Sequence, residues 1–444
     1  MSSILIKNGT MVTPRGLFTS DVKIVDGVVA EIGKDLDSRG VDRVIDASGL
    51  LVFPGVIDEH VHMREPGLEY KDDFTHGTRA AAKGGVTTVI EHPNTLPPVE
   101  TSEAVEKKGK YLSRKAWVDF ALLGVIHDSN IHEIRDMVKA GAVGFKVFMG
   151  PTTGNIPPPK DTTLLQALTI ASNLGVTVAF HAEDNELIEY YTAKAKSKGA
   201  SPELHEEARP PLAEVYSISK IAVLARATGA SVHIVHVSSA DAVEAVIAAR
   251  EKGVKITAET CPHYLYLNRA DYAKHGSLIK VNPPIRGAHH QQVLWEELRK
   301  GNIQTVGSDH APHAPEEKNK NIWEAASGMP GVQTLFPLML HAALERKIPL
   351  ELIPKMLSET PARLFGLWPR KGRIEIGFDG DIVIVNPEDY TVVTQEWLEY
   401  KHKLSPYLGW RLRGKIVYTI VRGQVVYENG ILSEKPVGEW VKPK

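Results

Sequence analysis

Two histidines and an arginine stand at alternate positions in the stretch FPGVIDEHVHMREPG, behind a run of apolar residues. Residues two apart on a strand point to the same face, so His60, His62 and Arg64 are expected to share one face. Neutral imidazole is a good ligand for zinc and similar divalent ions, although the histidines could also be packed without a metal. A guanidinium pairs bidentately with a carboxylate, which favours Arg64 as an anion-binding residue. The alternative for Arg64 is a salt bridge to Glu65 or Asp73.

Lys146 interrupts the apolar run VGFKVFM, where an ammonium would be badly desolvated. Burial lowers the pKa of a lysine, and a neutral amine can react with carbon dioxide to give a carbamate. The two carbamate oxygens could bridge two metal ions. The alternative is an unmodified lysine that extends from the strand end into solvent. The residue alone does not separate these two interpretations.

The elements that must position these side chains are short apolar runs that recur after helical segments. Three of the segments, TLLQALTIASNLG, EVYSISKIAVLARATG and DAVEAVIAAREKG, close with a glycine suited to end a helix. Apolar strands that alternate with helices predict an α/β fold with a parallel sheet, and eight such units make a TIM-like (β/α)8 barrel. The eight predicted strands are residues 56–62, 86–92, 118–124, 143–149, 176–182, 232–238, 255–261 and 303–309.

The two ends of the chain differ from this middle. Alternating residues with Asn-Gly or Asp-Gly pairs, as in ILIKNGTMV and SDVKIVDGVVAEIG, predict hairpins near the N-terminus, and KIVYTIVRGQVVYENG resembles them near the C-terminus. We therefore expect one small β-sandwich built from both termini. The predicted division is 1–53 and 367–444 for the sandwich and 54–366 for the barrel.

Polar residues recur where the predicted strands end, and the active site of such a barrel lies at this C-terminal edge. A random scatter of polar residues would not prefer one end. The histidine side chains and the aspartate at these strand ends are expected to converge on divalent metal ions. The loop 149–162, rich in Gly, Pro and Thr, could act as a lid above them. The residues at the strand ends are His60, His62, Asn94, Lys146, His181, His236, Asn282 and Asp309.

The composition of the chain limits the classes of partner that we expect it to bind. The chain has 444 residues, 43% of them hydrophobic and 24% charged, with a formal net charge of −2 and no basic or acidic block. This argues against nucleic acid or a membrane surface as an obligate partner. The single cysteine, Cys261, cannot form an intrachain disulfide, and no run has the length of a signal peptide core or a membrane span. We expect a soluble, cytoplasmic protein that acts on a small molecule.

With these residues collected, the chain resembles the cyclic amidohydrolases, the group of dihydroorotases, allantoinases and hydantoinases. The motifs PGVIDEHVHMREPG, GFKVFMG, HAEDN, HVSS, CPHYLYL, KVNPPIR and SDHAPH carry the resemblance, which spans essentially the whole chain. The resemblance implies a metal-dependent hydrolase with two divalent ions, taken to be zinc, and a hydroxide between them that attacks a ring amide. It implies His60, His62 and Asp309 on one ion, His181 and His236 on the other, and carbamylated Lys146 bridging both. Asp309 would act as general base and then general acid.

The pattern HVHMREPG together with HPNTLPP is similar to dihydroorotases, in which it grips the substrate carboxylate. The first expectation is therefore a dihydroorotase, which interconverts N-carbamoyl-L-aspartate and L-dihydroorotate in pyrimidine biosynthesis. The implied substrate contacts are Arg64, Asn94, Asn282, His313, and the backbone at Ser327 and Gly328.

Two alternatives remain open. The long segment that begins HAEDNELIEYY and the C-terminal EYKHKLSPYLGWRLRGK look more like allantoinases and hydantoinases (dihydropyrimidinases). Allantoin carries no carboxylate, however, so an inward arginine is less easily explained. A non-catalytic scaffold of the same fold is the other alternative, although every metal-ligand position is filled here. By analogy with relatives the chain would be a homo-oligomer, and it could dock on another enzyme of its pathway.

Overall fold

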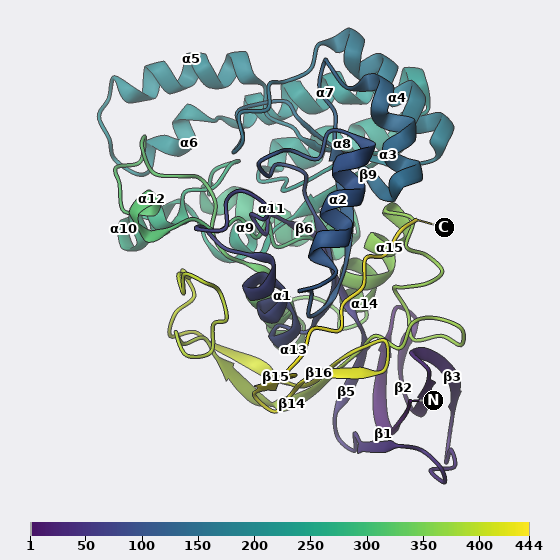
Figure 1. Cartoon of the computed structure of the whole chain (residues 1–444). Coiled ribbons are helices and arrows are strands. Elements are labelled where there is room, and N and C mark those ends of the chain that lie inside the picture. Colours follow the sequence, from purple (N-terminus) through teal and green to yellow (C-terminus); the bar gives the residue numbers. More distant parts are fainter. Residues whose placement is uncertain (1, 444) are drawn as a thin grey trace.

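The computed structural model describes residues 2–443 as a barrel of parallel strands with a second sheet beside it (Figure 1). The barrel sheet has eight strands in the order β13-β12-β11-β10-β9-β8-β7-β6, so each strand pairs with its neighbour in sequence. A parallel bridge between Val61 and His310 links the two ends of this order. The barrel strands are β6 (Val56–Val61), β7 (Val86–Glu91), β8 (Asp119–Val125), β9 (Ala142–Phe148), β10 (Thr177–His181), β11 (Val232–Ile234), β12 (Ile256–Thr260) and β13 (Thr305–Val306).

The predicted (β/α)8 barrel is confirmed, and its strands are buried on both faces. Every residue of β6, β7, β8 and β9 is buried, as expected for a parallel sheet covered by helices on one side and filled with side chains on the other. Two predicted strands are too long. β11 ends at Ile234 and β13 at Val306, because the chain leaves strand geometry to reach His236 (φ 43°) and Asp309 (φ 46°). Both residues have a left-handed backbone that most side chains avoid.

Helices surround the barrel, and two of them end as predicted at a glycine. α4 and α7 close at Gly175 (φ 68°) and Gly229 (φ 70°), where a left-handed residue stops the helix. In α8 the cap is Lys252, and the left-handed glycine is the next residue, Gly253 (φ 80°). The helices are α1 (Phe74–Lys83), α2 (Ser102–Leu112), α3 (Ile134–Ala140), α4 (Asp161–Leu174), α5 (Asn185–Lys196), α6 (Leu204–Ala208), α7 (Pro211–Thr228), α8 (Ala240–Glu251), α9 (Pro262–Tyr266), α10 (Tyr272–His275), α11 (Ala288–Lys300), α12 (Pro315–Lys318), α13 (Val332–Leu344), α14 (Leu352–Pro354) and α15 (Thr360–Leu364).

The second sheet combines strands from both termini, as the sequence predicts. Its nine strands run β17-β16-β15-β14-β5-β1-β2-β3, with β4 paired to β1, and the antiparallel pairing of β14 with β5 joins the two ends of the chain. A separate apolar core that includes Ile6, Val22 and Ile384 lies on it. The domain limits at 53/54 and 366/367 stay a prediction. The strands are β1 (Ser3–Thr13), β2 (Gly16–Val25), β3 (Val28–Gly33), β4 (Arg43–Asp46), β5 (Leu51–Pro54), β14 (Ile382–Val392), β15 (Arg411–Val421), β16 (Gln424–Glu428) and β17 (Ile431–Leu432).

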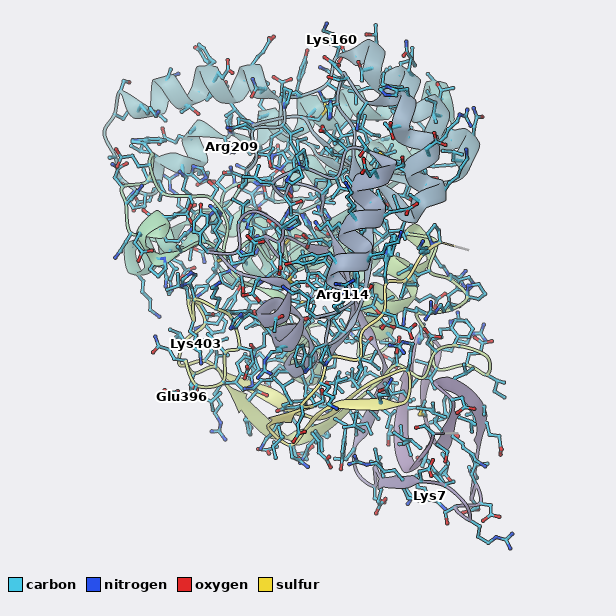
Figure 2. The ribbon with its side chains drawn as sticks, viewed as in Figure 1. Lys7, Arg114, Lys160, Arg209, Glu396 and Lys403 are labelled. Atoms are coloured by element: carbon cyan, nitrogen blue, oxygen red, sulfur yellow. The ribbon has the colours of Figure 1, made fainter. Side chains whose placement is uncertain are left out.

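A buried ion-pair network connects the barrel to the C-terminal segment. The Asp119 carboxylate, on β8, accepts from Lys371 Nζ at 2.7 Å and from Arg422 Nε at 3.0 Å. Lys371 also donates to Asp381 at 2.6 Å. Other charged side chains, such as Arg114 and Lys160, project from the surface (Figure 2). None of the helices in residues 2–443 combines the length and the apolar character needed to cross a membrane.

Candidate metal centre and substrate pocket

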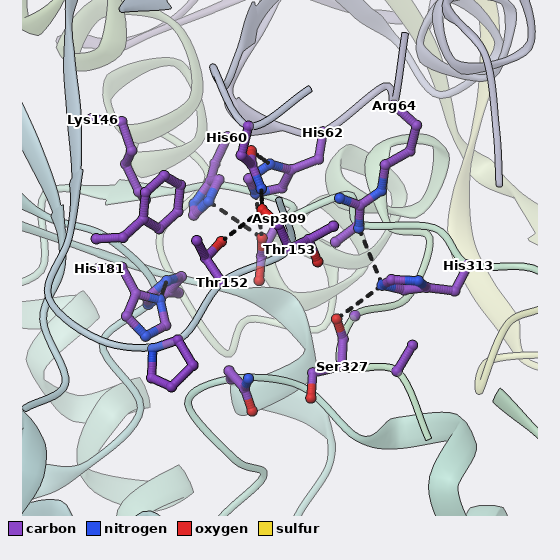
Figure 3. Close-up of a pocket in the computed structure, with 18 of the residues that line it drawn as sticks. His60, His62, Arg64, Lys146, Thr152, Thr153, His181, Asp309, His313 and Ser327 are labelled. Carbon is purple, nitrogen blue, oxygen red and sulfur yellow. Dashed lines mark hydrogen bonds and ion pairs between the residues drawn. The ribbon is translucent and has the colours of Figure 1, made fainter. Parts of the chain in front are cut away.

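A cavity of about 330 Å³ opens at the C-terminal end of the barrel strands, and all twelve predicted site residues line it (Figure 3). They come from segments up to more than 200 residues apart in sequence, and the fold brings their side chains to one cavity. The roles of the individual residues stay proposals. The twelve are His60, His62, Arg64, Asn94, Lys146, His181, His236, Asn282, Asp309, His313, Ser327 and Gly328.

His60 and His62 point toward Asp309 as a metal site requires. The Nε2 atoms of both histidines lie 3.3 Å from Asp309 Oδ1. Each ring is oriented through its other nitrogen: His60 Nδ1 is 2.8 Å from Glu259 Oε1, and His62 Nδ1 is 2.6 Å from Asn94 Oδ1. With Nδ1–H donated to these oxygens, each Nε2 keeps a free lone pair. Burial lowers the pKa of both histidines, which favours the neutral imidazole that metal binding requires.

A second pair of imidazoles lies beside the first. His181 Nδ1 and His236 Nε2 are 2.9 Å apart, while Glu183 Oε2 lies 2.8 Å from the other nitrogen of His181. Arg209 holds that carboxylate through a buried bidentate contact, with its Nε 3.0 Å from Glu183 Oε1. The backbone N–H of His236 donates to Glu259 at 2.9 Å. The pair has the donor set and orientation for one divalent ion.

Lys146 is fully buried at the wall of this cavity. Among the described residues its Nζ has no hydrogen-bond partner, and the ammonium lies 5.4 Å from the centre of the Phe148 ring. The alternative of a lysine extending into solvent is therefore wrong, since its exposed fraction is 0%. Burial lowers the pKa of Lys146 to about 8, which favours the neutral amine that carbamate formation needs. An orphaned amine beside two imidazole pairs fits a group that bridges two ions.

The opposite wall of the cavity is cationic. Lys71 Nζ donates to His313 Nδ1 at 2.9 Å, which leaves Nε2–H to donate to the Ser327 carbonyl at 3.0 Å. Arg64 lies 3.2 Å from that same Nε2, but two donors cannot bond each other. Arg64 Nε donates to the Pro312 carbonyl at 3.1 Å.

The terminal amino groups of Arg64 therefore lack an acceptor among the described residues and face the cavity. The alternative of a salt bridge to Glu65 or Asp73 is wrong, because Glu65 pairs with Lys115 and Asp73 with His76. Burial lowers the pKa of Arg64 only to about 10, so the guanidinium stays charged at neutral pH.

Two other buried histidines, His233 and His310, lie outside the cavity. His233 contacts Glu59 Oε1 at 3.2 Å and Thr257 Oγ1 at 2.7 Å below the cavity. His310 faces Asp72 and packs on the Tyr400 ring with ring centres 5.3 Å apart. Neither lines the cavity.

Several residues at the site escape the sequence interpretation. Lys71 lines the cavity from a loop, where no periodic pattern marks it. Thr152 and Thr153 line it from the loop 149–162, for which the sequence predicts only a position above the site. Glu259 holds His60, but it looks like any acidic residue of a strand. His92 stacks on His60 with ring centres 4.1 Å apart. Its position at the end of β7, like that of His60 on β6, is a signal that could have found it.

Comparison with known proteins agrees with this geometry. The chain is 38% identical to an allantoinase of Rubrobacter xylanophilus over 99% of its length and 98% of the relative's, and 37% identical to an allantoinase of Deinococcus radiodurans over 99% of both. The L-hydantoinase (dihydropyrimidinase) of Arthrobacter aurescens superposes with a TM-score of 0.96 at 35% identity over 100% of both chains. The model of the amidohydrolase family matches residues 51–426, so the chain belongs to the amidohydrolase family and is a hydrolase acting on cyclic amides.

Proposed function

We propose that the chain opens the five-membered ring of allantoin, and that related hydantoin rings are its secondary substrates. The observation that carries the proposal is the match to allantoinases over essentially the full length of both chains. This replaces dihydroorotase as the first expectation, because the relatives named above are allantoinases and a hydantoinase rather than dihydroorotases.

His60, His62 and Asp309 would hold one divalent ion, His181 and His236 the second, and a carbamate on Lys146 both. Zinc suits this set of imidazole and carboxylate ligands. Two such ions lower the pKa of water and polarise a carbonyl group. Glu259 and Asn94 orient the rings of His60 and His62 through hydrogen bonds, and the Glu183 carboxylate lies 2.8 Å from His181 Nε2.

Asp309 is positioned to move the proton in the reaction. Burial raises the pKa of its carboxyl, but the hydrogen bond and charge of His62 outweigh that effect and hold the pKa below the ordinary value. The carboxylate can accept a proton from the attacking water as the carbon–oxygen bond forms. It then delivers that proton to the ring nitrogen as the carbon–nitrogen bond breaks. The product is the ring-opened ureide, whose new carboxyl group on the former ring carbon releases its proton to solvent.

The cationic wall gives the substrate its orientation. The free N–H groups of Arg64 face the cavity, and the carbonyl oxygen of an exocyclic ureido group can accept from them. This accounts for an inward arginine without a substrate carboxylate.

A second candidate function is dihydroorotase, which one observation favours. Arg64 and Lys71 both line the cavity, and Arg64 has no carboxylate partner among the described residues. A substrate carboxylate would supply that partner. A cytoplasmic location is part of the proposal and rests on the composition of the sequence. A homo-oligomeric state and docking to a pathway enzyme are also part of it and rest on analogy with relatives.

The deciding experiment is a side-by-side assay of the zinc-loaded protein on allantoin, hydantoin, dihydrouracil, L-dihydroorotate and N-carbamoyl-L-aspartate. We expect the highest kcat/KM on allantoin. Turnover of dihydroorotate without turnover of allantoin would overturn the first proposal in favour of the second. A protein that binds no stoichiometric metal and opens none of these rings would be a scaffold.

A further inference from the structure

Residues 325–329 form a segment at the rim of the cavity in which every carbonyl accepts a hydrogen bond. His313 bonds the Ser327 carbonyl at 3.0 Å, and the Ala311 N–H bonds the Met329 carbonyl at 3.0 Å. The other three carbonyls in the segment accept from two lysine side chains, Lys280 and Lys318. Five consecutive carbonyls held in this way leave the segment little freedom to move.

Lys318 is the centre of this arrangement. Its Nζ donates to the Ala326 and Gly328 carbonyls, each at 2.8 Å, and to the Lys280 carbonyl at 3.1 Å. The side chain is 5% exposed. A lysine ammonium has three N–H groups, so the three carbonyls use its whole capacity.

Lys280 extends the arrangement by one carbonyl. Its Nζ donates to the Ala325 carbonyl at 2.6 Å, and its own carbonyl accepts from the Gly328 N–H at 2.9 Å. Among the described residues each of the two ammonium groups donates only to backbone carbonyls. Burying two ammonium groups without a carboxylate partner has a large desolvation free energy. If these positions served packing alone, apolar residues would give a more stable protein.

The segment that the lysines hold faces the substrate space. Ser327 and Gly328 line the cavity, and the Ser327 N–H has no partner among the hydrogen bonds of residues 2–443. Gly328 has a φ of 134°, and a Cβ there would lie 2.4 Å from the Ala311 carbonyl oxygen. A small shift of this backbone would therefore change both its contacts with a substrate ring in the cavity and its packing against Ala311. Figure 3 shows Ser327 beside His313 and away from Lys146 and His181.

We propose that Lys318, assisted by Lys280, is a positioning residue that fixes the Ser327–Gly328 backbone against the substrate ring. The proposal rests on the proposed ring-opening function. Neither side chain contacts a proposed metal ligand, so the pair sets how tightly the ring is held rather than how fast the bond breaks. Losing such a contact raises KM and leaves kcat nearly unchanged, because binding in the ground state and in the transition state weakens equally.

The test compares Lys318→Met and Lys280→Met with Lys320→Met, a control at an exposed lysine two residues along. Each variant is loaded with zinc, and its metal content, KM and kcat are measured. Hydrogen exchange of residues 325–329 is followed in the ligand-free protein. We expect Lys318→Met to raise KM about tenfold or more, with kcat within about threefold, and to speed exchange in the segment. Lys280→Met should act in the same direction with a smaller effect, and Lys320→Met should match wild type.

Wild-type KM and wild-type exchange in both Lys318→Met and Lys280→Met would overturn the proposal, and so would a fall in kcat with KM unchanged. If Lys318→Met fails to fold, Lys280→Met decides by the same readouts. Failure of the proposed function is a separate result. If wild type opens none of the rings, hydrogen exchange of residues 325–329 still tests whether the two lysines hold the segment. Exchange that is equal in wild type and in both variants overturns the inference.

Discussion

The Nδ1 of His62 lies 2.6 Å from the Oδ1 of Asn94, so the asparagine orients a proposed metal ligand. The Asn94 Nδ2 donates in turn to the Thr153 carbonyl at 3.3 Å, which connects the same amide to the loop 149–162. The sequence predicts Asn94 as a substrate contact. The geometry adds a role in fixing the tautomer of His62.

Asn94→Ala is expected to weaken metal binding about 10- to 100-fold, the usual effect of removing a residue that orients a ligand. The reason is that His62 loses the acceptor for its Nδ1–H. Competition against a chelator with known zinc affinity measures the change. Asn94→Asp keeps an oxygen acceptor and should retain near wild-type affinity. If Asn94→Ala keeps wild-type zinc affinity but has a raised KM, then Asn94 contacts the substrate ring and does not orient a metal ligand.

Arg64→Met is expected to raise KM about 10- to 100-fold for the preferred ring, because a charged hydrogen-bond donor to the substrate is lost. Steady-state kinetics on allantoin and dihydroorotate measure it, with Arg114→Met as a control on the surface. The loss should be larger for any substrate with a carboxylate, since that contact is an ion pair. An unchanged KM on every ring would show that the guanidinium does not touch substrate.

Lys146→Ala is expected to leave the protein folded but with less than half of the wild-type metal and no measurable turnover. The mutation removes the amine that would carry the carbamate between the two ions. Native mass spectrometry of wild type should show one carbon dioxide added per chain, and none in the variant. Two metal ions bound to Lys146→Ala, or wild type without the added mass, would contradict the carbamate.

The sequence could point to the proposed metal ligands because each lies within or just after an apolar strand run. The barrel then forces the strand ends to meet, which places His181 and Asp309 together although 128 positions separate them in the numbering. Lys71, Glu259 and Lys318 could not be predicted in this way. Lys71 and Glu259 act through hydrogen bonds to His313 and His60, which lie far away in the chain. Lys318 bonds backbone carbonyls of a nearby loop, and neither kind of pairing leaves a periodic pattern.

The substrate was the least predictable feature. The REPG and PNT motifs favour a dihydroorotase, whereas the relatives named above, which match over the full length, are two allantoinases and a hydantoinase. The same donors at Arg64 can serve a carboxylate or a neutral carbonyl, so the residue type alone does not specify the ligand.

The buried ion pairs of Asp119 with Lys371 and Arg422 should make the stability of the protein depend on pH. Burial raises the pKa of Asp119, but the charges of Lys371 and Arg422 outweigh burial and hold the pKa below its ordinary value. A carboxyl whose pKa is lowered by folding stabilises the protein above its unfolded pKa, about 4, and loses that contribution as pH falls further. Asp119→Asn leaves the buried Lys371 ammonium with one partner fewer and should cost about 3–5 kcal/mol at pH 7.

Thermal unfolding of wild type and Asp119→Asn between pH 7 and pH 3 tests this expectation. The difference between the two proteins should be largest at neutral pH and shrink as pH falls below about 4, because the carboxyl in the unfolded wild-type chain then takes up a proton, whereas the folded Asp119 loses its charge only below its lowered pKa. Asp136→Asn removes an exposed carboxylate that contacts Lys139 at 2.8 Å and serves as the control with little effect. If the stability difference between the two proteins is equal at every pH, then Asp119 stabilises the contact between the barrel and the C-terminal segment by packing rather than by its charge.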